Sequence, residues 1–301
     1  MTAIDILIPT GDATNDQPLL DTVRTYLVRE EAINTIQLSG FHARDAFDPQ
    51  NMVLVARSRA EIAGVATLQA PFNLLLSHIE HEAAIPALAA WARQLDWQPP
   101  GVTGPSAAAL AFATAWRDLT GQQFRPGMAQ RILATSMVRH PSGVPGSWRL
   151  TGEADAGFLL DWFAAFVVEA DLGSKDDAVT AAEALLKAQW PGTGNVLWLD
   201  ATGQPVSLAR YKAPTPHGVR IGPVYTPPEH RRRGYGSAVT AAATQLMLDR
   251  GFDFVCLYTD AANPTSNHIY EELGYRLVAD SMQYRFVSAP GDEEGGDGHH
   301  R

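Results

Sequence analysis

The segment Val224–Ala243, VYTPPEHRRRGYGSAVTAAA, decides the fold expected for the C-terminal half of this 301-residue chain. It places three arginines and a Gly-Tyr-Gly-Ser turn between a strand-like segment and an alanine-rich segment that favours a helix. Gly234 and Gly236 lack a Cβ, so the backbone can bend tightly there and direct its amides outward. A helix N-terminus leaves its N–H groups unpaired and carries about half a positive charge. The turn therefore predicts an anion-binding site.

The anion that suits this turn is a pyrophosphate, because Arg231, Arg232 and Arg233 add more charge than one carboxylate needs. The alternative is a helix start with a solvated basic cap, since runs of charge usually lie on the surface. The P-loop pattern GxxxxGK[ST] is absent, and the dinucleotide pattern GxGxxG fails at its third glycine, where Val239 stands. The pattern that is present is Arg-x-x-Gly-x-Gly.

Size and composition exclude several classes of protein. A chain of 301 residues with 46% apolar content is long enough for two domains. Its 33 acidic and 23 basic side chains give a formal net charge of −10, which argues against a nucleic-acid partner. No apolar run reaches the ~20 residues of a membrane span, and the N-terminus lacks a secretory pattern, so we expect a cytoplasmic protein without a membrane partner. The single cysteine, Cys256, excludes an intrachain disulfide, and we expect no metal site.

Proline, glycine and serine concentrate in Arg139–Trp148, which is typical of a linker. We place the boundary near Pro145. The expected organisation is an N-terminal domain over residues 1–144, a C-terminal domain over 145–288, and a disordered polar tail over 289–301.

Apolar periodicity predicts the elements of the C-terminal half. We expect a helix through Leu159–Val167, a helix over 177–190, a hairpin over 195–213, a strand over 217–226, a helix to about Arg250, a strand over 253–259, a helix from Asn263 and a final pair of strands from Tyr275 to Val287. The N-terminal half repeats this pattern more weakly and without the arginine-glycine turn. The sequence thus predicts an α/β fold of two related domains, each a mixed sheet flanked by helices, with the C-terminal one complete.

The spacing Arg231-x-x-Gly234-x-Gly236, ahead of a long helix, resembles the coenzyme A signature of the GNAT N-acetyltransferase superfamily. A second element agrees with this resemblance, because a strand follows the helix and the next helix then supplies Asn263, Ser266, Asn267 and Tyr270. The resemblance covers about Ser147 to Val287. The whole chain also resembles two-domain members of the superfamily whose front half is a degenerate copy.

The resemblance implies that the protein uses acetyl-CoA as a co-substrate. The turn would bind the pyrophosphate, and the strand before it would pair through its backbone with the pantetheine amides. A backbone N–H near Val224 or Tyr225 would face the thioester oxygen. The implied cofactor-binding residues are Val224, Tyr225, Thr226, Arg231, Arg232, Arg233, Gly234, Tyr235, Gly236, Ser237, Asn263, Ser266, Asn267 and Tyr270.

In such enzymes a neutral amine attacks the thioester directly, and Tyr270 takes the family's position for the acid that protonates the leaving thiolate. The alternative for Tyr270 is a tyrosine that packs on the sheet. Many members carry a glutamate on the strand before the turn, where this chain has only Arg220 and Gly222. The general base is therefore unassigned. Glu169 and Asp171, at the end of the first helix of this half, are candidates for the acceptor pocket or a solvated helix end.

The leading hypothesis is an acyl-CoA-dependent N-acyltransferase that moves acetyl to a primary amine. A non-catalytic acyl-CoA-binding module is the alternative, supported by the missing strand glutamate. A third hypothesis is an interaction protein that docks through its front half. Among enzymes, the two-domain layout also suggests an acetyltransferase similar to the mycothiol synthases. Asn263 is a pantetheine contact, an N-cap before Pro264, or both.

Overall fold

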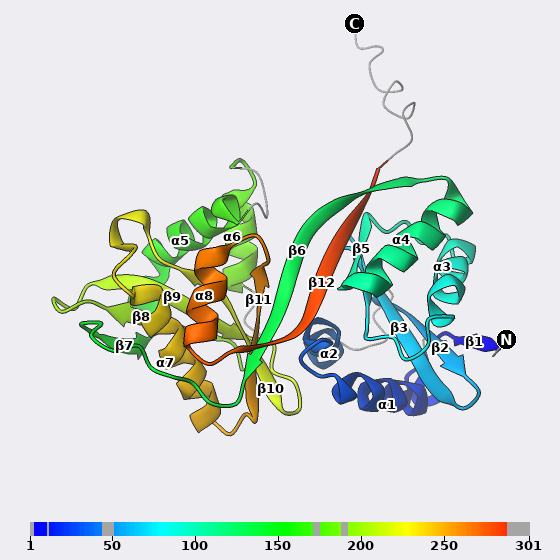
Figure 1. Ribbon diagram of the computed structural model, residues 1–301, viewed down its shortest axis with the longest axis horizontal. Coiled ribbons are helices and arrows are strands. Elements are labelled where there is room, and N and C mark those ends of the chain that lie inside the picture. The colour runs from blue at the N-terminus through cyan, green and yellow to red at the C-terminus, as the bar shows by residue number, and fades with distance from the viewer. Residues whose placement is uncertain (1–2, 11, 44–50, 171–174, 188–191, 288–301) are drawn as a thin grey trace, which may run out of the picture. The chain divides into compact units, whose positions relative to one another are not determined.

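The computed structural model describes residues 3–10, 12–43, 51–170, 175–187 and 192–287 (Figure 1). The predicted tail over 289–301 and the candidate Asp171 lie outside the described residues. The chain divides into two compact units. The first contains the described residues up to Ile132 together with residues 260–262 and 279–287, and the second contains residues from Leu133 to Thr259 together with 263–278.

The two halves of the chain share one order of elements, strand-helix-helix-strand-strand-strand-helix-strand-helix-strand. The first half contains β1 (Ile4–Leu7), α1 (Ala13–Arg29), α2 (Thr35–Ala43), β2 (Asn51–Ser58), β3 (Glu61–Gln69), β4 (Leu74–Leu76), α3 (Ala84–Gln94), β5 (Gly101–Pro105), α4 (Ser106–Thr120) and β6 (Gln123–Thr135). The second contains β7 (Ser147–Leu150), α5 (Ala156–Glu169), α6 (Ala178–Lys187), β8 (Gly194–Leu199), β9 (Pro205–Lys212), β10 (Gly218–Tyr225), α7 (Tyr235–Asp249), β11 (Phe254–Asp260), α8 (Pro264–Glu272) and β12 (Arg276–Val287). Short 3-10 turns lie at Glu153–Asp155 and Pro228–His230. This repetition confirms the predicted pair of related α/β domains.

The expected boundary near Pro145 differs from the division of the structure, which falls at Ile132 and Leu133. The proline- and glycine-rich stretch packs inside the second unit instead. The carbonyl of Pro145 accepts a hydrogen bond of 3.0 Å from Trp198 Nε1. Its neighbour Val144 lies so close to Gly234 that a Cβ there would stand 2.7 Å from Val144 Cγ2. The stretch is thus an ordered loop beside the arginine-glycine turn.

The end of the chain also differs from the expectation. Residues from Tyr275 to Val287 were predicted as a pair of strands, but Arg276–Val287 forms one strand, β12. Its residues from 279 onward belong to the first unit, where Ser281–Arg285 pair antiparallel with Gly101–Pro105 of β5. The second unit therefore does not contain all of its predicted last strand, because that strand finds its partner in the first unit's sheet.

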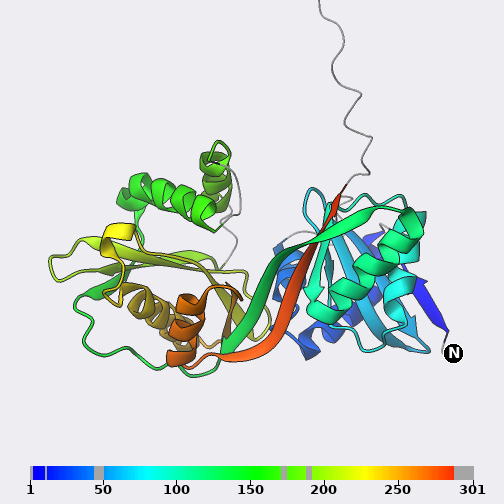
Figure 2. The same ribbon diagram turned by 45° about the horizontal axis from the view of Figure 1, so that its top comes forward.

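Helices cover both faces of the sheet of the second unit, with α5 and α6 on one face and α7 and α8 on the other (Figure 2). Successive side chains of β9 point to opposite faces of the sheet, and each face therefore has its own apolar cluster. Leu208 packs with Leu159 and Phe163 of α5, whereas Ala209 and Tyr211 pack on the side of α7. In the described helices, none has the length and apolar composition that crossing a bilayer requires.

The first unit is built in the same way. Leu88 of α3 and Phe112 of α4 pack against one face of its sheet, and Leu20 and Leu27 of α1 pack against the other. Strands β2 and β3 of this half form an antiparallel hairpin that pairs from Asn51 to Ser58 of β2.

Candidate functional site

Strand β10 separates from β11 halfway along its length. The two strands pair in parallel from Gly218 to Ile221, and the described register stops there. On its other side β10 pairs with β9 as far as Tyr225. From Ile221 to Val224, three residues along β10 correspond to only two residues along β9, and this irregularity is a β-bulge. The bulge contains Gly222 at φ +139° and Pro223, which has no N–H to donate. The backbone of Val224 and Tyr225 thus diverges from β11 and is available to a ligand.

The turn after β10 leads into the N-terminus of α7. Arg232 has φ +60° and Gly234 has φ +80°, so the backbone passes twice through the left-handed region before the helix begins at Tyr235. Gly234 is the N-cap residue and offers no side chain to the first N–H groups of α7. A Cβ on Gly236 would lie 3.4 Å from Thr226 Oγ1, which places the first turn of the helix against the end of β10. The geometry is that of an anion cradle.

The three arginines of the turn occupy two different environments. Arg232 and Arg233 are exposed. Arg231 folds back on the strand, where its Nε donates to the carbonyl of Thr226 at 2.8 Å and its Nη2 lies 2.5 Å from Glu169 Oε2. Its guanidinium also stands 5.8 Å from the ring centre of Tyr225. Arg231 therefore fixes the shape of the turn, and Arg232 and Arg233 are the cations free to meet an anion.

The carboxylate of Glu169 joins the end of α5 to the end of β10. Besides its ion pair with Arg231, it accepts a hydrogen bond of 3.2 Å from the Tyr225 hydroxyl. Burial, followed by the nearby carboxylate, raises the pKa of Tyr225 above its ordinary value. Tyr225 thus remains a protonated donor to Glu169 at neutral pH.

Ser207 of β9 is a site residue that the sequence analysis missed. Its hydroxyl is fully buried, donates to the carbonyl of Tyr225 at 3.1 Å and shares a hydrogen bond of 2.8 Å with Thr226 Oγ1. It holds the strand end in place beneath the turn. The available signal was a small polar residue within the otherwise apolar run PVSLA.

The residues predicted on α8 lie beside the same core as β10. Tyr270 and Val224 both pack against the apolar cluster under α7, and the ring centres of Tyr270 and Tyr275 are 6.0 Å apart. Burial raises the pKa of Tyr270 to about 12. Within the part of the chain that the structure describes, its hydroxyl has no hydrogen-bonding partner. Tyr270 is thus a protonated phenol with its donor unused.

Asn263 is the N-cap of α8, as one of the two predictions for it required. Its Oδ1 accepts a hydrogen bond of 3.0 Å from the backbone N–H of Ser266, and Pro264 stands at the first helical position. Asn267 is buried, and its backbone N–H donates to the carbonyl of Asn263 at 3.1 Å. Contact of these residues with a ligand stays a prediction.

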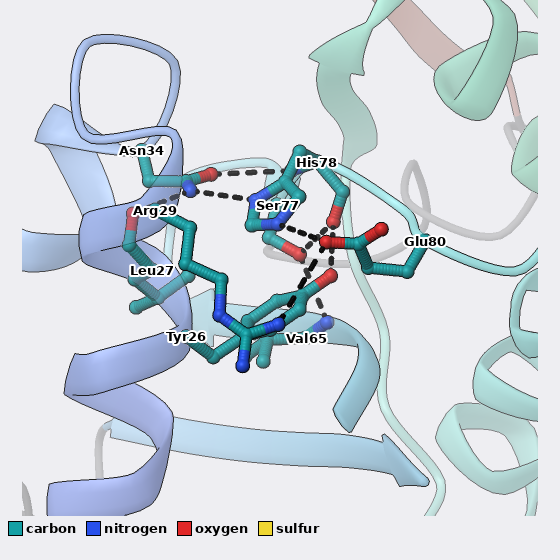
Figure 3. Close-up of polar contacts among 8 residues, drawn as sticks. All are labelled: Tyr26, Leu27, Arg29, Asn34, Val65, Ser77, His78 and Glu80. Atoms are coloured by element: carbon teal, nitrogen blue, oxygen red, sulfur yellow. Dashed lines mark hydrogen bonds and ion pairs between the residues drawn. The ribbon is translucent and has the colours of Figure 1, made fainter. Parts of the chain in front are cut away.

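The corresponding position of the first unit is filled by its own side chains (Figure 3). By element order β4 corresponds to β10, and the residues after it include His78, whose ring stacks on Tyr26 at 4.3 Å. Asn34 Nδ2 lies 2.9 Å from His78 Nδ1, and the Tyr26 hydroxyl donates to the His78 carbonyl at 2.8 Å. A Cβ on Gly104 of β5 would stand 2.8 Å from the Cβ of Leu76, so β4 and β5 stay in close contact. In the described part of the first unit, β4 thus does not diverge from β5 as β10 does from β11.

No group of three His, Cys, Asp or Glu side chains in the described ranges is arranged to bind a metal ion. Cys256 is buried in β11.

Parts of the chain are similar to known proteins. Residues 206–286 match the family model described as FR47-like protein. A mycothiol acetyltransferase of Pseudarthrobacter chlorophenolicus is 32% identical over 141 residues, which are 45% of this chain and 43% of the relative. One of Salinispora tropica is 30% identical over 193 residues, 60% of each chain. The chain thus spans less than two thirds of the length of these curated relatives.

A solved tandem GNAT protein from the clavulanic acid biosynthesis pathway superposes with a TM-score of 0.54 at 15% identity, covering 96% of this chain and 100% of that one. This likeness concerns the fold. Two units of one element order, an opened strand and a glycine turn before a helix define the class of tandem GNAT folds. The fold is thus that of the tandem GNAT proteins, and residues 206–286 are similar to the FR47-like family.

Proposed function

We propose that the protein is an acetyl-CoA-dependent N-acetyltransferase whose reaction takes place in the second unit. The observation that carries this proposal is the divergence of β10 from β11 directly before a helix whose N-terminus lacks a side-chain cap. The first opens a strand edge for an extended ligand, and the second provides N–H donors for its phosphates.

In this proposal the pyrophosphate of acetyl-CoA lies on the amides of residues 232–237, with Arg232 and Arg233 beside it. The pantetheine arm pairs with the backbone of Val224 and Tyr225 as an added strand would. The bulge after Ile221 supports this placement, because it turns the strand edge away from β11. Ser207 and Arg231 keep that edge in position through Tyr225 and Thr226.

The proposed reaction is a direct attack of a neutral amine on the thioester carbon. A C–N bond forms, the C–S bond breaks, and the carbonyl oxygen is stabilised by a backbone N–H near Val224 while it carries charge. The Tyr270 hydroxyl protonates the leaving thiolate, and the proton that the attacking nitrogen loses returns through solvent to the Tyr270 phenolate, so that the amide and the free thiol form with no net release of a proton. With a pKa of about 12, Tyr270 is protonated throughout the neutral range and holds the proton that this step requires.

Glu169 stays a candidate catalytic residue, and its contacts favour a positioning role. Both of its oxygens are engaged, one by Arg231 and one by Tyr225. We infer that Glu169 holds the turn and the strand end together.

A mycothiol acetyltransferase activity is the second candidate, because the relatives that align with part of this chain are named mycothiol acetyltransferases. Those regions cover 43% and 60% of the relatives, so the acceptor cannot be transferred from them to this chain.

The experiment that separates catalysis from simple binding is the variant Tyr270→Phe, assayed by thiol release from acetyl-CoA in the presence of amines. Loss of the acid should lower kcat about 10²- to 10³-fold and leave the Kd for acetyl-CoA within about twofold. The control is Tyr284→Phe, a half-buried tyrosine of β12 in the first unit. Equal turnover in Tyr270→Phe and the parent would remove Tyr270 from the mechanism, and binding without turnover in the parent would favour the non-catalytic module.

A further inference from the structure

Three cationic side chains gather on the face of the second unit's sheet that α5 covers. Leu208 of β9 packs against α5, so Arg210 and Lys212, two and four residues further along the strand, lie on the same face. Arg220 of β10 stands directly opposite Lys212 in the register and shares that face. None of the three belongs to the turn that is proposed to bind pyrophosphate.

The two arginines stand over aromatic rings, and the lysine lies between their charges. Arg210 is 3% exposed, lies 5.6 Å from the ring centre of Phe163 and donates to Asn195 Oδ1 at 3.4 Å. Arg220 lies 5.7 Å from the ring centre of Tyr258. Burial, and then the charges of Arg220 and Arg210, lower the pKa of Lys212 to about 7.

No carboxylate among the described residues forms an ion pair with Lys212 or Arg220. Like charges directly opposite each other on neighbouring strands repel, and partly buried charges without counter-ions destabilise the fold. The arrangement is unfavourable by itself. An anionic group placed between Lys212 and Arg220 would relieve the repulsion and supply the missing hydrogen-bond acceptors.

The cluster of Arg210, Lys212 and Arg220 lies close along β10 to the backbone that is proposed to bind acetyl-CoA. Arg220 precedes the bulge at Gly222 by two residues and Val224 by four, about 13 Å of extended chain. It lies on the side of Val224 away from the turn at residues 231–236. A ligand that enters from the turn and follows β10 reaches Val224 first, and the cluster lies beyond its reactive end.

We propose that Lys212 and Arg220 form the acceptor-binding surface, and that the acceptor is an amine that also carries an oxyanion, a carboxylate or a phosphate. The proposal rests on the acetyltransferase function proposed above and specifies its substrate class. A simple cationic amine would be repelled by this surface. An amine that carries a carboxylate or phosphate would be held by that group while its nitrogen faces the thioester.

Acetyl transfer to matched pairs of acceptors tests the substrate class. One pair is an amino acid and its amide, taken across the common amino acids, and the other is glucosamine 6-phosphate and glucosamine. The anionic member of a pair should be preferred at least about tenfold in kcat/KM. A preference within the amino acid pair alone would identify the anion as a carboxylate, and a preference within the glucosamine pair alone would identify it as a phosphate. Equal rates within both pairs would overturn the proposal.

The variants Lys212→Met and Arg220→Met test the residues. Each should raise the KM for the anionic acceptor about tenfold or more and leave the Kd for acetyl-CoA unchanged. The matched control is Lys187→Met, since Lys187 is an exposed lysine of α6 paired with Glu183. An unchanged KM in both variants would refute the assignment. Failure of the parent to bind acetyl-CoA would instead refute the proposed function.

Anion binding at Lys212 can also be measured without acetyl transfer, even if none of these acceptors reacts. The chain has three lysines, Lys175, Lys187 and Lys212, so their Cε NMR signals can be followed separately. Saturating inorganic phosphate should raise the pKa of Lys212 above about 8 in the full-length protein and leave that of Lys187 unchanged. In Arg220→Met the effect of phosphate should weaken. No response of Lys212 to phosphate or to acetate would contradict an anion site.

Discussion

Arg231 and Glu169, 62 positions apart in the sequence, form an ion pair in which Nη2 lies 2.5 Å from Oε2. The pair joins the arginine-glycine turn to the end of α5. The sequence pattern assigns Arg231 to the pyrophosphate, whereas the structure shows that its guanidinium is already used by Thr226 and Glu169. The cradle therefore depends on Arg231 for its shape.

The variants Arg231→Met and Glu169→Gln should weaken acetyl-CoA binding by a similar factor, about three- to tenfold, because each releases the same contact between the turn and α5. Both side chains are more than two fifths exposed, so the free energy of unfolding should fall by no more than about 1 kcal/mol. Calorimetric titration and urea unfolding of the two single variants and the double variant measure both effects. Additive losses of affinity in the double variant would show that the pair does not act as a unit.

Gly234→Ala should destabilise the second unit by about 1–3 kcal/mol. The position has φ +80°, and the new Cβ would meet Val144 Cγ2 at 2.7 Å. The matched control is Gly203→Ala, which has φ +84° but nothing within 4 Å, so that it carries the backbone strain without the clash. In urea unfolding, Gly234→Ala should have a clearly lower free energy of unfolding than Gly203→Ala. Equal values would mean that the loop at Val144 moves aside without a loss of stability.

Acceptor affinity should depend on the protonation of Lys212. Burial and two guanidinium groups lower the pKa of this lysine to about 7, so the ammonium form that attracts an oxyanion is lost as the pH rises above about 7. The charged and titratable groups recorded against it are Arg210 of β9 and Arg220 of β10. The KM for an anionic acceptor should rise between pH 6.5 and 8.5, while Lys212→Met should show a high KM that does not change over this range. A KM for the parent that is constant with pH would count against the role of Lys212.

The lowered pKa of Lys212 also predicts how the free energy of unfolding changes with pH. Between about pH 7 and 10.5 the unfolded chain keeps the Lys212 proton that the folded chain has released. The unfolded state thus binds more protons, and the free energy of unfolding should rise with pH in this window. Urea midpoints of the parent should increase relative to those of Lys212→Met from pH 7 to 9. A constant difference between the two would show that the pKa is not lowered.

In the first unit, His78 should likewise make the free energy of unfolding rise with pH, but in the acid range. Its Nδ1 accepts from Asn34, and burial lowers the pKa of the ring, so the folded state holds it neutral. Below about pH 6.5 the unfolded chain binds the proton more readily, and stability should decrease as the pH falls. An NMR titration of the histidine ring signals should find that the pKa of His78 is lower in the folded protein than in the urea-unfolded chain. An equal or higher pKa in the folded protein would contradict this account of the cluster.

The turn illustrates how much of the site can be predicted from sequence. Glycines at Gly234 and Gly236 between a strand and an alanine-rich segment are a local signal, and the structure places the expected tight turn and helix start there, with Gly234 at φ +80° and Gly236 in the first turn of α7. The contacts of Arg231 could not be predicted in the same way, because Glu169 is distant in sequence. The cluster of Lys212 and Arg220 likewise depends on strand register, which a single sequence does not specify.

The division of the chain shows a second limit. The stretch around Pro145 has the composition of a linker, but composition cannot tell an interdomain segment from an ordered loop. The apolar pattern of Arg276–Val287 identifies β-structure and does not specify which sheet it joins. The order of elements in the C-terminal half, in contrast, was predicted from periodicity, whereas the N-terminal half showed only part of the repeat that the structure contains.

The central claim is that acetyl-CoA binds at the turn before α7, and calorimetric titration of Gly236→Val with acetyl-CoA tests it most directly. Gly236 is the second residue of α7, where a side chain would stand beside Thr226 without a left-handed backbone, so the variant should fold. Gly157→Val is the matched control, at the second residue of α5 with open space around it. The account predicts saturable binding to the parent and to Gly157→Val, with a Kd at least about tenfold higher for Gly236→Val. Equal affinity in all three proteins, or no binding to the parent, would contradict it.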